Sequence, residues 1–376
     1  MKIPFNKPFL SGKELEYIRE AVESGKISGD GEFTRKCQRF FESSYGFHKT
    51  LLTTSCTDAL EMCAILIDTK PGDEIIMPSF TFVSTANAFV LRGAKIVFAD
   101  SRADNPNIDD TRIEMLITPK TKAIVVVHYA GIACNMDPIL SMAKRHGLFV
   151  IEDAAQSVDS FYKGRPLGSL GELSAFSFHE TKNVIAGEGG MIAINDKRFE
   201  KRAEIIREKG TNRSAFFRGE VDKYGWVDVG SSFLPSEVTA AFLFAQLESL
   251  RTIQDKRIKL WNLYLHLLSP LEKEGHFQVP QIPKYATNNA HMFYLICSSI
   301  VERTKLIAAL REKEILSVFH YQSLHRSPYY RAKYAGPILS NADRYTDCLL
   351  RLPMYYELRE EDVTNICSVI SKFYVQ

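Results

Sequence analysis

Hydrophobic and polar positions follow two periods along this 376-residue chain, one typical of strands and one typical of helices. Short apolar runs at 73–78, 95–99, 123–127 and 148–152 predict buried strands, and segments of helical spacing such as 138–146 lie between them. Strands that alternate with helices are typical of a parallel sheet that is covered on both faces. The pattern therefore predicts an α/β protein with a doubly wound, mostly parallel sheet.

The pattern changes in the last third of the chain. An amphipathic run over 238–268 predicts two consecutive helices, and a polar, proline-rich stretch follows in the 270s and 280s. Strand-like segments at 293–296 and 318–321, with a helix over 305–313, then predict a small α+β unit. Because the chain exceeds the size at which one core stops growing, we expect two domains, at 1–250 and 251–376.

Two helix starts are predicted from hydroxyl and acidic residues. Ser11 has the features of an N-cap, with Glu14 at the third helical position. A hydroxyl-rich turn follows the strand-like segment 50–54, and its N–H groups and helix dipole would favour a phosphate. The alternative at this turn is an ordinary N-cap, Ser55 or Thr57, which these residues alone favour.

Composition and charge exclude several classes of protein. A net charge of +2 gives no reason to expect a nucleic-acid or membrane partner, and no apolar run is long enough to span a bilayer. Seven cysteines without a Cys-x-x-Cys pair predict reduced thiols rather than disulfides or a zinc site, and His325 has no partners at metal-ligand spacing. From this spacing we expect a protein without a metal. No signal peptide is evident at the N-terminus, so we also expect a cytoplasmic protein.

Candidate chemistry lies in a turn between two strand-like segments, where Lys182 stands close to the glycine-rich stretch 187–190. Taken alone, such a lysine is most often a solvated surface residue. Upstream, however, an apolar segment ends in Asp153, at the kind of strand end where open α/β sheets bind ligands. A lysine that can form a Schiff base and an aspartate that keeps a pyridine nitrogen protonated are what pyridoxal phosphate chemistry requires.

Several motifs resemble one known family. FSFHETKN followed by GEGG, EDAAQ at a strand end, and PSFTFVSTANA are similar to the DegT/DnrJ/EryC1/StrS family of pyridoxal phosphate-dependent nucleotide-sugar aminotransferases. The resemblance runs from IPFNKPFLSGKE to VFHYQSLH and implies the aspartate aminotransferase fold (fold type I), with a large domain and a smaller α+β C-terminal domain. HETKN, IREKGTNRSAFFRG and VDKYGW are most similar to members that make dTDP-4-amino-4,6-dideoxygalactose for enterobacterial common antigen.

The resemblance implies a role for each matching residue. Lys182 would be the catalytic lysine, and Asp153 would be the partner of the pyridine nitrogen. Pyridoxal 5′-phosphate would further contact Cys56, Thr57, Phe82, Gln156, Ser177 and Ser232. The sugar substrate would contact Gly29, His179, Arg213, His320 and Tyr321.

Some of these positions have a second interpretation. Gly29 can belong to a simple turn, Phe82 can be a core phenylalanine, and Arg213 can lie in a solvated loop. Ser232 stands where many relatives carry an asparagine that reaches the phosphate of the neighbouring subunit's cofactor, so this departure leaves the cross-subunit contact open.

The resemblance also implies a reaction. L-Glutamate would donate its amino group to C4 of dTDP-4-dehydro-6-deoxy-D-glucose, giving 2-oxoglutarate and a dTDP-4-amino-4,6-dideoxyhexose, with the galacto product favoured, on a homodimer with shared active sites. The gluco product, amination at C3 and a uridine nucleotide stay open. Sugar dehydratases of this fold carry histidine in place of Lys182. A non-catalytic cofactor-binding regulator would normally carry a DNA-binding domain, and no basic recognition helix is evident.

Overall fold

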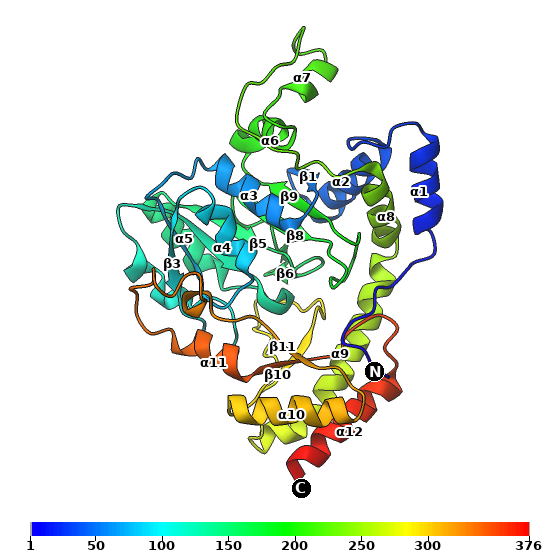
Figure 1. Ribbon diagram of the computed structural model, residues 1–376, viewed down its shortest axis with the longest axis vertical. Helices are drawn as coiled ribbons and strands as arrows, with labels where there is room; N and C mark the ends of the chain where they lie inside the picture. The colour runs from blue at the N-terminus through cyan, green and yellow to red at the C-terminus, as the bar shows by residue number, and fades with distance from the viewer. Residues whose placement is uncertain (1, 376) are drawn as a thin grey trace.

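A seven-stranded sheet forms the centre of the protein in the computed structural model, which describes residues 2–375 (Figure 1). The strand order is β1-β9-β8-β5-β4-β2-β3, and β9 runs antiparallel to both neighbours whereas the other neighbouring pairs are parallel. The strands are β1 (Lys49–Thr53), β2 (Glu74–Pro78), β3 (Lys95–Ala99), β4 (Thr121–Val127), β5 (Phe149–Asp153), β8 (Leu173–Ser177) and β9 (Gly190–Ile194). The predicted α/β fold with a mostly parallel sheet is confirmed.

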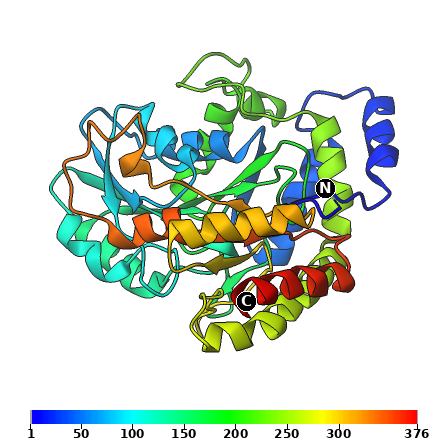
Figure 2. The same ribbon diagram turned by 60° about the horizontal axis from the view of Figure 1, so that its bottom comes forward.

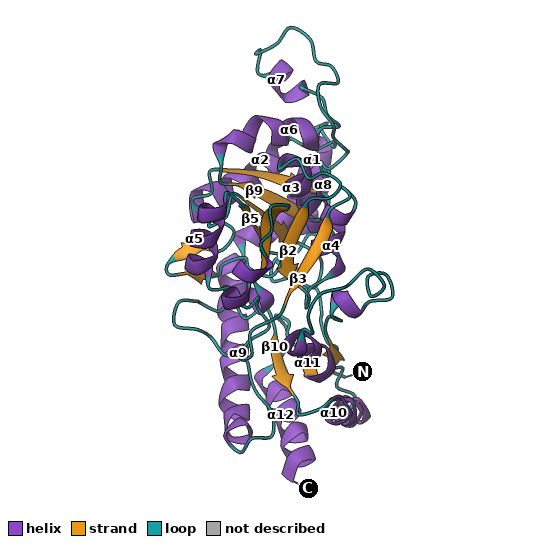
Figure 3. Ribbon diagram, turned by 90° about the vertical axis from the view of Figure 1, so that its left-hand side faces the viewer, coloured by secondary structure: helices purple, strands orange, loops and turns teal. Residues whose placement is uncertain are grey.

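Helices cover both faces of this sheet (Figure 3). One face is covered by α3 (Cys56–Leu66), α4 (Val83–Val90) and α6 (Glu200–Arg207). The other face is covered by α1 (Glu14–Glu23), α2 (Glu32–Tyr45), α5 (Met136–His146) and α8 (Glu237–Glu248). The large unit also contains a two-stranded sheet and short 3-10 turns, namely β6 (Phe161–Tyr162), β7 (Arg165–Pro166), η1 (Asp110–Arg112), η2 (Glu114–Leu116), η3 (Tyr129–Gly131) and η4 (Lys197–Phe199).

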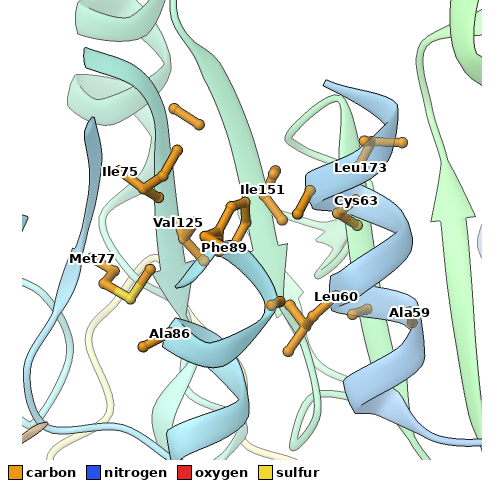
Figure 4. Close-up of a cluster of buried hydrophobic side chains, with 14 of the residues drawn as sticks. Ala59, Leu60, Cys63, Ile75, Met77, Ala86, Phe89, Val125, Ile151 and Leu173 are labelled. Carbon is orange, nitrogen blue, oxygen red and sulfur yellow. The ribbon is translucent and has the colours of Figure 1, made fainter. Parts of the chain in front are cut away.

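Successive strand residues point to opposite faces, as the strand period requires. Met77 of β2 and Val125 of β4 join Leu60 and Phe89 in one buried cluster (Figure 4), whereas Ile76 packs on the opposite side with α5. Each such side chain contributes about 1.5–3 kcal/mol when it is buried. Both faces of the sheet are therefore covered. This explains why its central strands have apolar runs without polar interruptions.

A glycine permits close packing where the β8–β9 hairpin meets helix α3. Gly190 pairs with Ser177 on one side and with Thr53 on the other. A Cβ atom on Gly190 would lie 2.3 Å from the carbonyl carbon of Ser55, so a side chain there would push α3 away. Glycine at this position therefore lets the first turn of α3 lie directly against the sheet.

The C-terminal third forms a second layered unit at the lower end of the molecule. Helix α9 (Leu250–Lys273) runs down from the large sheet to this unit (Figures 1 and 3). The three-stranded sheet has the order β10-β12-β11, with β10 (Phe293–Ile296), β12 (Leu349–Leu352) and β11 (Val318–Phe319). Figure 2 shows α12 beside α9, and the remaining elements are α10 (Ile300–Glu312), η5 (Leu324–Arg326), α11 (Ser340–Cys348) and α12 (Glu360–Val375). The division at residue 250 stays a prediction.

The two helix starts that the sequence predicts have different outcomes. Ser55 is the N-cap of α3, and its Oγ accepts the Asp58 N–H at 3.1 Å. Ser11 does not cap α1, which begins at Glu14. The carboxylate of Glu14 accepts the N–H groups of Ser11 and Gly12 at 2.6 and 2.9 Å, so the bonds run opposite to those of an N-cap.

A polar and aromatic segment between α6 and α8 projects from the top of Figure 1 and carries the short helix α7 (Arg213–Phe217). Its aromatic side chains include Phe217, Tyr224 and Trp226, all of them exposed. Among residues 2–375, no helix combines the length and the apolar character needed to cross a membrane.

Candidate active site

A cavity of about 710 Å³ lies where the carboxyl ends of β4, β5 and β8 face the second sheet. Val127, Asp153 and Ser177, the last residues of these three strands, all line it. This edge of a doubly wound sheet is where the rule for open α/β sheets places ligands. The cavity is lined by ten of the residues that the sequence predicts for the site, namely Cys56, Thr57, Phe82, Asp153, Gln156, Ser177, His179, Lys182, His320 and Tyr321.

Lys182 reaches the cavity from a tight turn after β8. The turn is closed by the Lys182 N–H, which donates to the His179 carbonyl at 2.9 Å. The His179 ring tightens it further, because its Nδ1 accepts the Thr181 N–H at 3.2 Å and lies 3.0 Å from the Thr181 hydroxyl. Burial lowers the pKa of Lys182 from its ordinary value, although Cys56 and Asp153 act in the opposite direction. The amine is therefore easier to deprotonate than one in water.

Asp153 stands at the end of β5 with only 5% of its surface exposed. Its Oδ2 accepts the Thr85 hydroxyl at 2.7 Å, and its Oδ1 accepts the Ala155 N–H at 3.2 Å. Burial raises the pKa of this carboxyl, whereas the bonds from Thr85 and Ala155 and the charge of Lys182 lower it. The side chain is thus oriented by two donors but lacks a cation at bonding distance among residues 2–375.

The first turn of α3 forms the end of the cavity that suits a phosphate. The N–H groups of Cys56 and Thr57 donate to no acceptor within residues 2–375, as expected for a helix start. The Thr57 hydroxyl lies 2.8 Å from the Ser84 hydroxyl, and Ser177 lines the same cavity. Together with the dipole of an 11-residue helix, these donors suit an anion. Burial raises the pKa of the Cys56 thiol, which keeps it neutral.

Aromatic side chains form one wall of the cavity. Phe82 is 53% exposed, so its ring is open to the cavity rather than buried in the core, and Tyr321 lies 6.0 Å from it. Gln156 is fixed between the Ala130 N–H at 2.6 Å and the Tyr321 hydroxyl at 2.9 Å. The wall is therefore held by hydrogen bonds as well as by packing.

His320 belongs to the same wall. Its ring stacks on that of Tyr321 at 3.6 Å, and its Nδ1 lies 2.6 Å from the Tyr129 hydroxyl. Burial lowers the pKa of His320 well below its ordinary value, so the ring is neutral at physiological pH.

Three predicted residues lie outside the lining of the cavity. A Cβ on Gly29 would come within 2.2 Å of the Pro235 carbonyl, so this glycine packs against the segment before α8. Arg213 belongs to α7, where its guanidinium lies 3.8 Å from Glu208. Ser232 forms an isolated bridge with Glu208, on the segment that follows the projecting loop.

Sequence reasoning missed several residues of the cavity. Ser84 lines the cavity and Thr85 bonds Asp153 from behind it; both lie in the first turn of α4, so the motif around Phe82 contained a signal for both. Arg351 comes from β12 and carried no signal, because a single arginine in a strand usually faces solvent. His325 lies outside the cavity lining and is buried, and its Nδ1 lies 2.7 Å from the Ser79 hydroxyl.

Comparison with known proteins identifies the family. Residues 8–371 match the model that describes the DegT/DnrJ/EryC1/StrS aminotransferase family. The chain belongs to this family. It is 31% identical to the spore coat polysaccharide biosynthesis protein SpsC of Bacillus subtilis, over 98% of this chain and 96% of that protein.

Solved structures share the fold of this chain. The aminotransferase TlmJ from Streptoalloteichus hindustanus superposes with a TM-score of 0.91 at 26% identity, over 99% of both chains. Spr1654 from Streptococcus pneumoniae, solved in its PMP-form, has a TM-score of 0.91 at 24% identity, over 99% of this chain and 98% of that one. The fold is therefore the predicted fold type I of the aminotransferases.

Pyridoxal 5′-phosphate is the cofactor of this DegT/DnrJ/EryC1/StrS aminotransferase. The residues of the cavity fit it. The unengaged N–H groups of Cys56 and Thr57, with nearby hydroxyls, would hold the phosphate. The open face of Phe82 would cover the ring, and Asp153 would accept a hydrogen bond from the ring nitrogen.

The side chains divide the chemistry between them. When bound, pyridoxal phosphate supplies an electron sink that lets a C–H bond beside nitrogen break. The Lys182 amine would take the proton from that carbon and return it to the carbon on the other side of the nitrogen, because burial favours its neutral, basic form. Asp153 would keep a proton on the ring nitrogen, since a nearby carboxylate favours the charged form of that nitrogen.

Proposed function

We propose that this aminotransferase moves the amino group of L-glutamate to C4 of dTDP-4-dehydro-6-deoxy-D-glucose. The products are 2-oxoglutarate and dTDP-4-amino-4,6-dideoxygalactose. The observation that carries the transamination is the position of Lys182 and Asp153 in one cavity, next to a helix start with unengaged N–H groups. This arrangement has a base, a partner for a ring nitrogen and an anion site.

The sugar substrate is supported by the motifs and by the relatives. HETKN, IREKGTNRSAFFRG and VDKYGW resemble the members that make this galacto product for enterobacterial common antigen. SpsC is named for polysaccharide biosynthesis. The cavity has the volume of a small-molecule site, and His320 and Tyr321 offer aromatic faces and polar atoms to a sugar ring.

We further propose a homodimer in which the projecting segment contacts the second copy. Phe217 is 69% exposed and Trp226 is 84% exposed, which is unusual for large apolar side chains that face only water. Ser232 follows on the same segment, where it bridges to Glu208, so a dimer through this region would place it close to the interface. Sedimentation of the wild-type protein and a Trp226→Ser variant would test this, with a monomeric wild type refuting it.

The function is tested by following its two halves separately. Glutamate added to the purified enzyme should change the absorbance of bound pyridoxal phosphate. The amount of 2-oxoglutarate formed should equal the amount of cofactor that reacts. The dTDP-4-keto sugar added next should restore the original spectrum. Lys182→Ala, with the cofactor present, should show neither change.

The product distinguishes the sugar assignments. Proton coupling constants at C4 in the NMR spectrum separate the galacto from the gluco epimer, and the position of the nitrogen separates C4 from C3 amination. A gluco product would refute the stereochemistry but leave the transaminase intact. A spectrum that no amino acid changes would refute the transaminase itself.

A further inference from the structure

His291 is a buried histidine that lines the same cavity as Lys182. Its backbone is fixed, because its N–H donates to Oδ1 of Asn289 at 3.1 Å and its carbonyl accepts the Arg257 guanidinium at 2.6 Å. Its ring makes one hydrogen bond within residues 2–375, in which Nδ1 lies 2.9 Å from Oδ1 of Asn183. Asn183 directly follows Lys182 in the chain, so the His291 ring is bonded to the lysine turn.

The bonds around Asn183 decide which atom of His291 donates. The side-chain nitrogen of Asn183 donates to the Asn289 carbonyl and to Oε1 of Gln254, both at 2.8 Å. A backbone carbonyl can only accept, so this orientation of the amide is fixed and its Oδ1 faces His291. An amide oxygen has no proton to give, and Nδ1 of His291 is therefore the donor in their bond.

The charge state of His291 makes its second ring nitrogen an acceptor. Burial lowers the pKa of His291 well below its ordinary value, and the positive charges of Lys182, Arg257 and Arg351 lower it further. The ring is therefore neutral at physiological pH, and with the proton on Nδ1 its Nε2 holds a lone pair. Nε2 has no hydrogen-bond partner within residues 2–375, so this lone pair is available to a donor inside the cavity.

Another buried histidine, His128, shows what a structural role looks like. Its Nδ1 accepts the Cys134 N–H at 3.1 Å, and its Nε2 lies 2.9 Å from the Glu152 carboxylate. Both ring nitrogens of His128 are thus used within the fold, away from the cavity. His291 uses only one, so the fold explains Nδ1 but not Nε2.

Lys182 is the donor that best fits this acceptor. Its amine makes no side-chain hydrogen bond within residues 2–375, and while it carries a proton it is an ammonium group with three N–H donors. A buried ammonium group without acceptors costs free energy. The Asp153 carboxylate is needed at the ring nitrogen of the cofactor, whereas Nε2 of His291 has no other role.

We propose that His291 is a positioning residue, whose Nε2 accepts an N–H of the Lys182 amine while the lysine carries the proton. This inference rests on the proposed transaminase function. The proton moves from the carbon of the amino donor to Nζ, and from Nζ to the carbon on the other side of the nitrogen. His291 neither gains nor loses a proton. A neutral acceptor suits this role, because a stronger base would take the proton away from the lysine.

Two substitutions separate the two ring nitrogens. Asparagine is short and places its amide N–H near the position of Nδ1, so His291→Asn keeps the bond to Asn183 and removes the acceptor. Glutamine is longer and places its amide oxygen near the position of Nε2, so His291→Gln keeps an acceptor and loses that bond. We expect His291→Asn to lower kcat of both half-reactions about tenfold at little changed KM, because a hydrogen bond to a charged group is lost. His291→Gln should lose less than about threefold in kcat, although it should have the lower thermal midpoint of the two.

Chemical labelling of Lys182 provides a readout that does not depend on turnover. Acetic anhydride modifies only neutral amines, and mass spectrometry of the full-length, cofactor-free protein gives the extent of labelling at Lys182 at each pH. An acceptor stabilises the ammonium form, so the labelling curve of Lys182 should move to lower pH in His291→Asn and stay close to the wild type in His291→Gln. His266→Asn is the matched control, because His266 is an exposed histidine on α9. This control should leave the curve and both half-reactions unchanged.

The outcomes distinguish this inference from the function on which it rests. If His291→Gln is the slower variant, only the bond to Asn183 matters, and the inference is overturned while the transaminase stands. A loss confined to the sugar half-reaction would place a sugar hydroxyl at Nε2 and would also overturn it. If no amino acid changes the wild-type spectrum, the proposed function fails by itself. An unmoved labelling curve in His291→Asn would overturn the contact between His291 and Lys182 in either case.

Discussion

Two neighbouring carboxylates at the end of β5 show how the same chemical group serves the fold or the site. Glu152 is fully buried, and its two oxygens accept N–H groups from Gly168, Leu170 and Gly171 at 2.6 to 2.8 Å. It also lies 2.9 Å from Nε2 of His128, whose Nδ1 accepts the Cys134 N–H at 3.1 Å. Since Nδ1 is an acceptor, Nε2 must carry the proton and donate it to Glu152.

Asp153, the next residue, has the opposite character. Strand alternation turns it to the other face of the sheet, where it receives only two donors and faces a cavity with Lys182. Glu152 is saturated with hydrogen bonds and contributes to stability. Asp153 retains acceptor capacity and a raised pKa, both of which cost stability in the protein alone. Unsatisfied bonding capacity, rather than burial, separates the functional carboxylate from the structural one.

The largest effect should come from Lys182, the partner of Asp153 across the cavity. Lys182→Ala should lower turnover by at least about 10⁴-fold, because both the attachment point and the proton carrier are lost. The thermal midpoint should change little, since Lys182 makes no side-chain hydrogen bond within residues 2–375. Activity and differential scanning fluorimetry on one preparation check both statements. A variant that keeps a tenth of the activity would contradict the assignment.

Asp153→Asn sharpens the comparison on the functional side. Asparagine keeps an acceptor for Thr85 but has no charge to hold a proton on the ring nitrogen. We expect turnover to fall about 10²- to 10³-fold, with cofactor still bound, as measured by steady-state kinetics and the absorbance of bound cofactor. If the variant were fully active, the carboxylate would have no role in the electron sink.

Sequence alone predicted much of this contrast. Apolar runs with both faces buried predicted the central strands, so the placement of Asp153 at a strand end followed from the pattern. The family motif then singled out Lys182. Ser55, one of the two N-cap candidates at its turn, caps its helix because capping depends on only a few adjacent residues.

The remainder depended on contacts between distant segments. Ser79 covers His325 and Phe5 covers Arg351, and neither pair is close in sequence. Ser11 lost its predicted capping role because Glu14 also accepts a bond from Gln246 on α8, at 2.6 Å, which fixes the carboxylate in place. Local patterns cannot anticipate such partners, since they arise only after the chain has packed.

Glu152→Gln tests the structural side. The side-chain amide would direct its NH₂ group at N–H donors, leaving about two hydrogen bonds unmade in a buried site. We expect the free energy of unfolding to fall by about 3 kcal/mol in urea denaturation. Activity per folded molecule should remain within a few-fold of the wild type. A large loss of turnover in fully folded protein would mean that Glu152 acts on the chemistry as well.

The smallest effect is a dependence of stability on pH, and it has a defined sign. Burial raises the pKa of Asp153 above its ordinary value of 3.8, so the folded state holds a proton at pH values where the unfolded chain has lost it. Stability from this group is present below pH 3.8 and is lost as pH rises through the folded pKa. Cofactor-free Asp153→Asn should therefore be more stable than the wild type at pH 7.

That advantage should shrink as the solution is acidified, because the wild-type carboxyl then becomes neutral as well. Urea midpoints of both proteins at several pH values between neutral and acidic conditions measure the difference. Glu152→Gln is the control, since it should be less stable than the wild type at neutral pH. If Asp153→Asn were equally destabilised, the two carboxylates would both serve the fold, and the distinction between saturated and available acceptors would not identify the site.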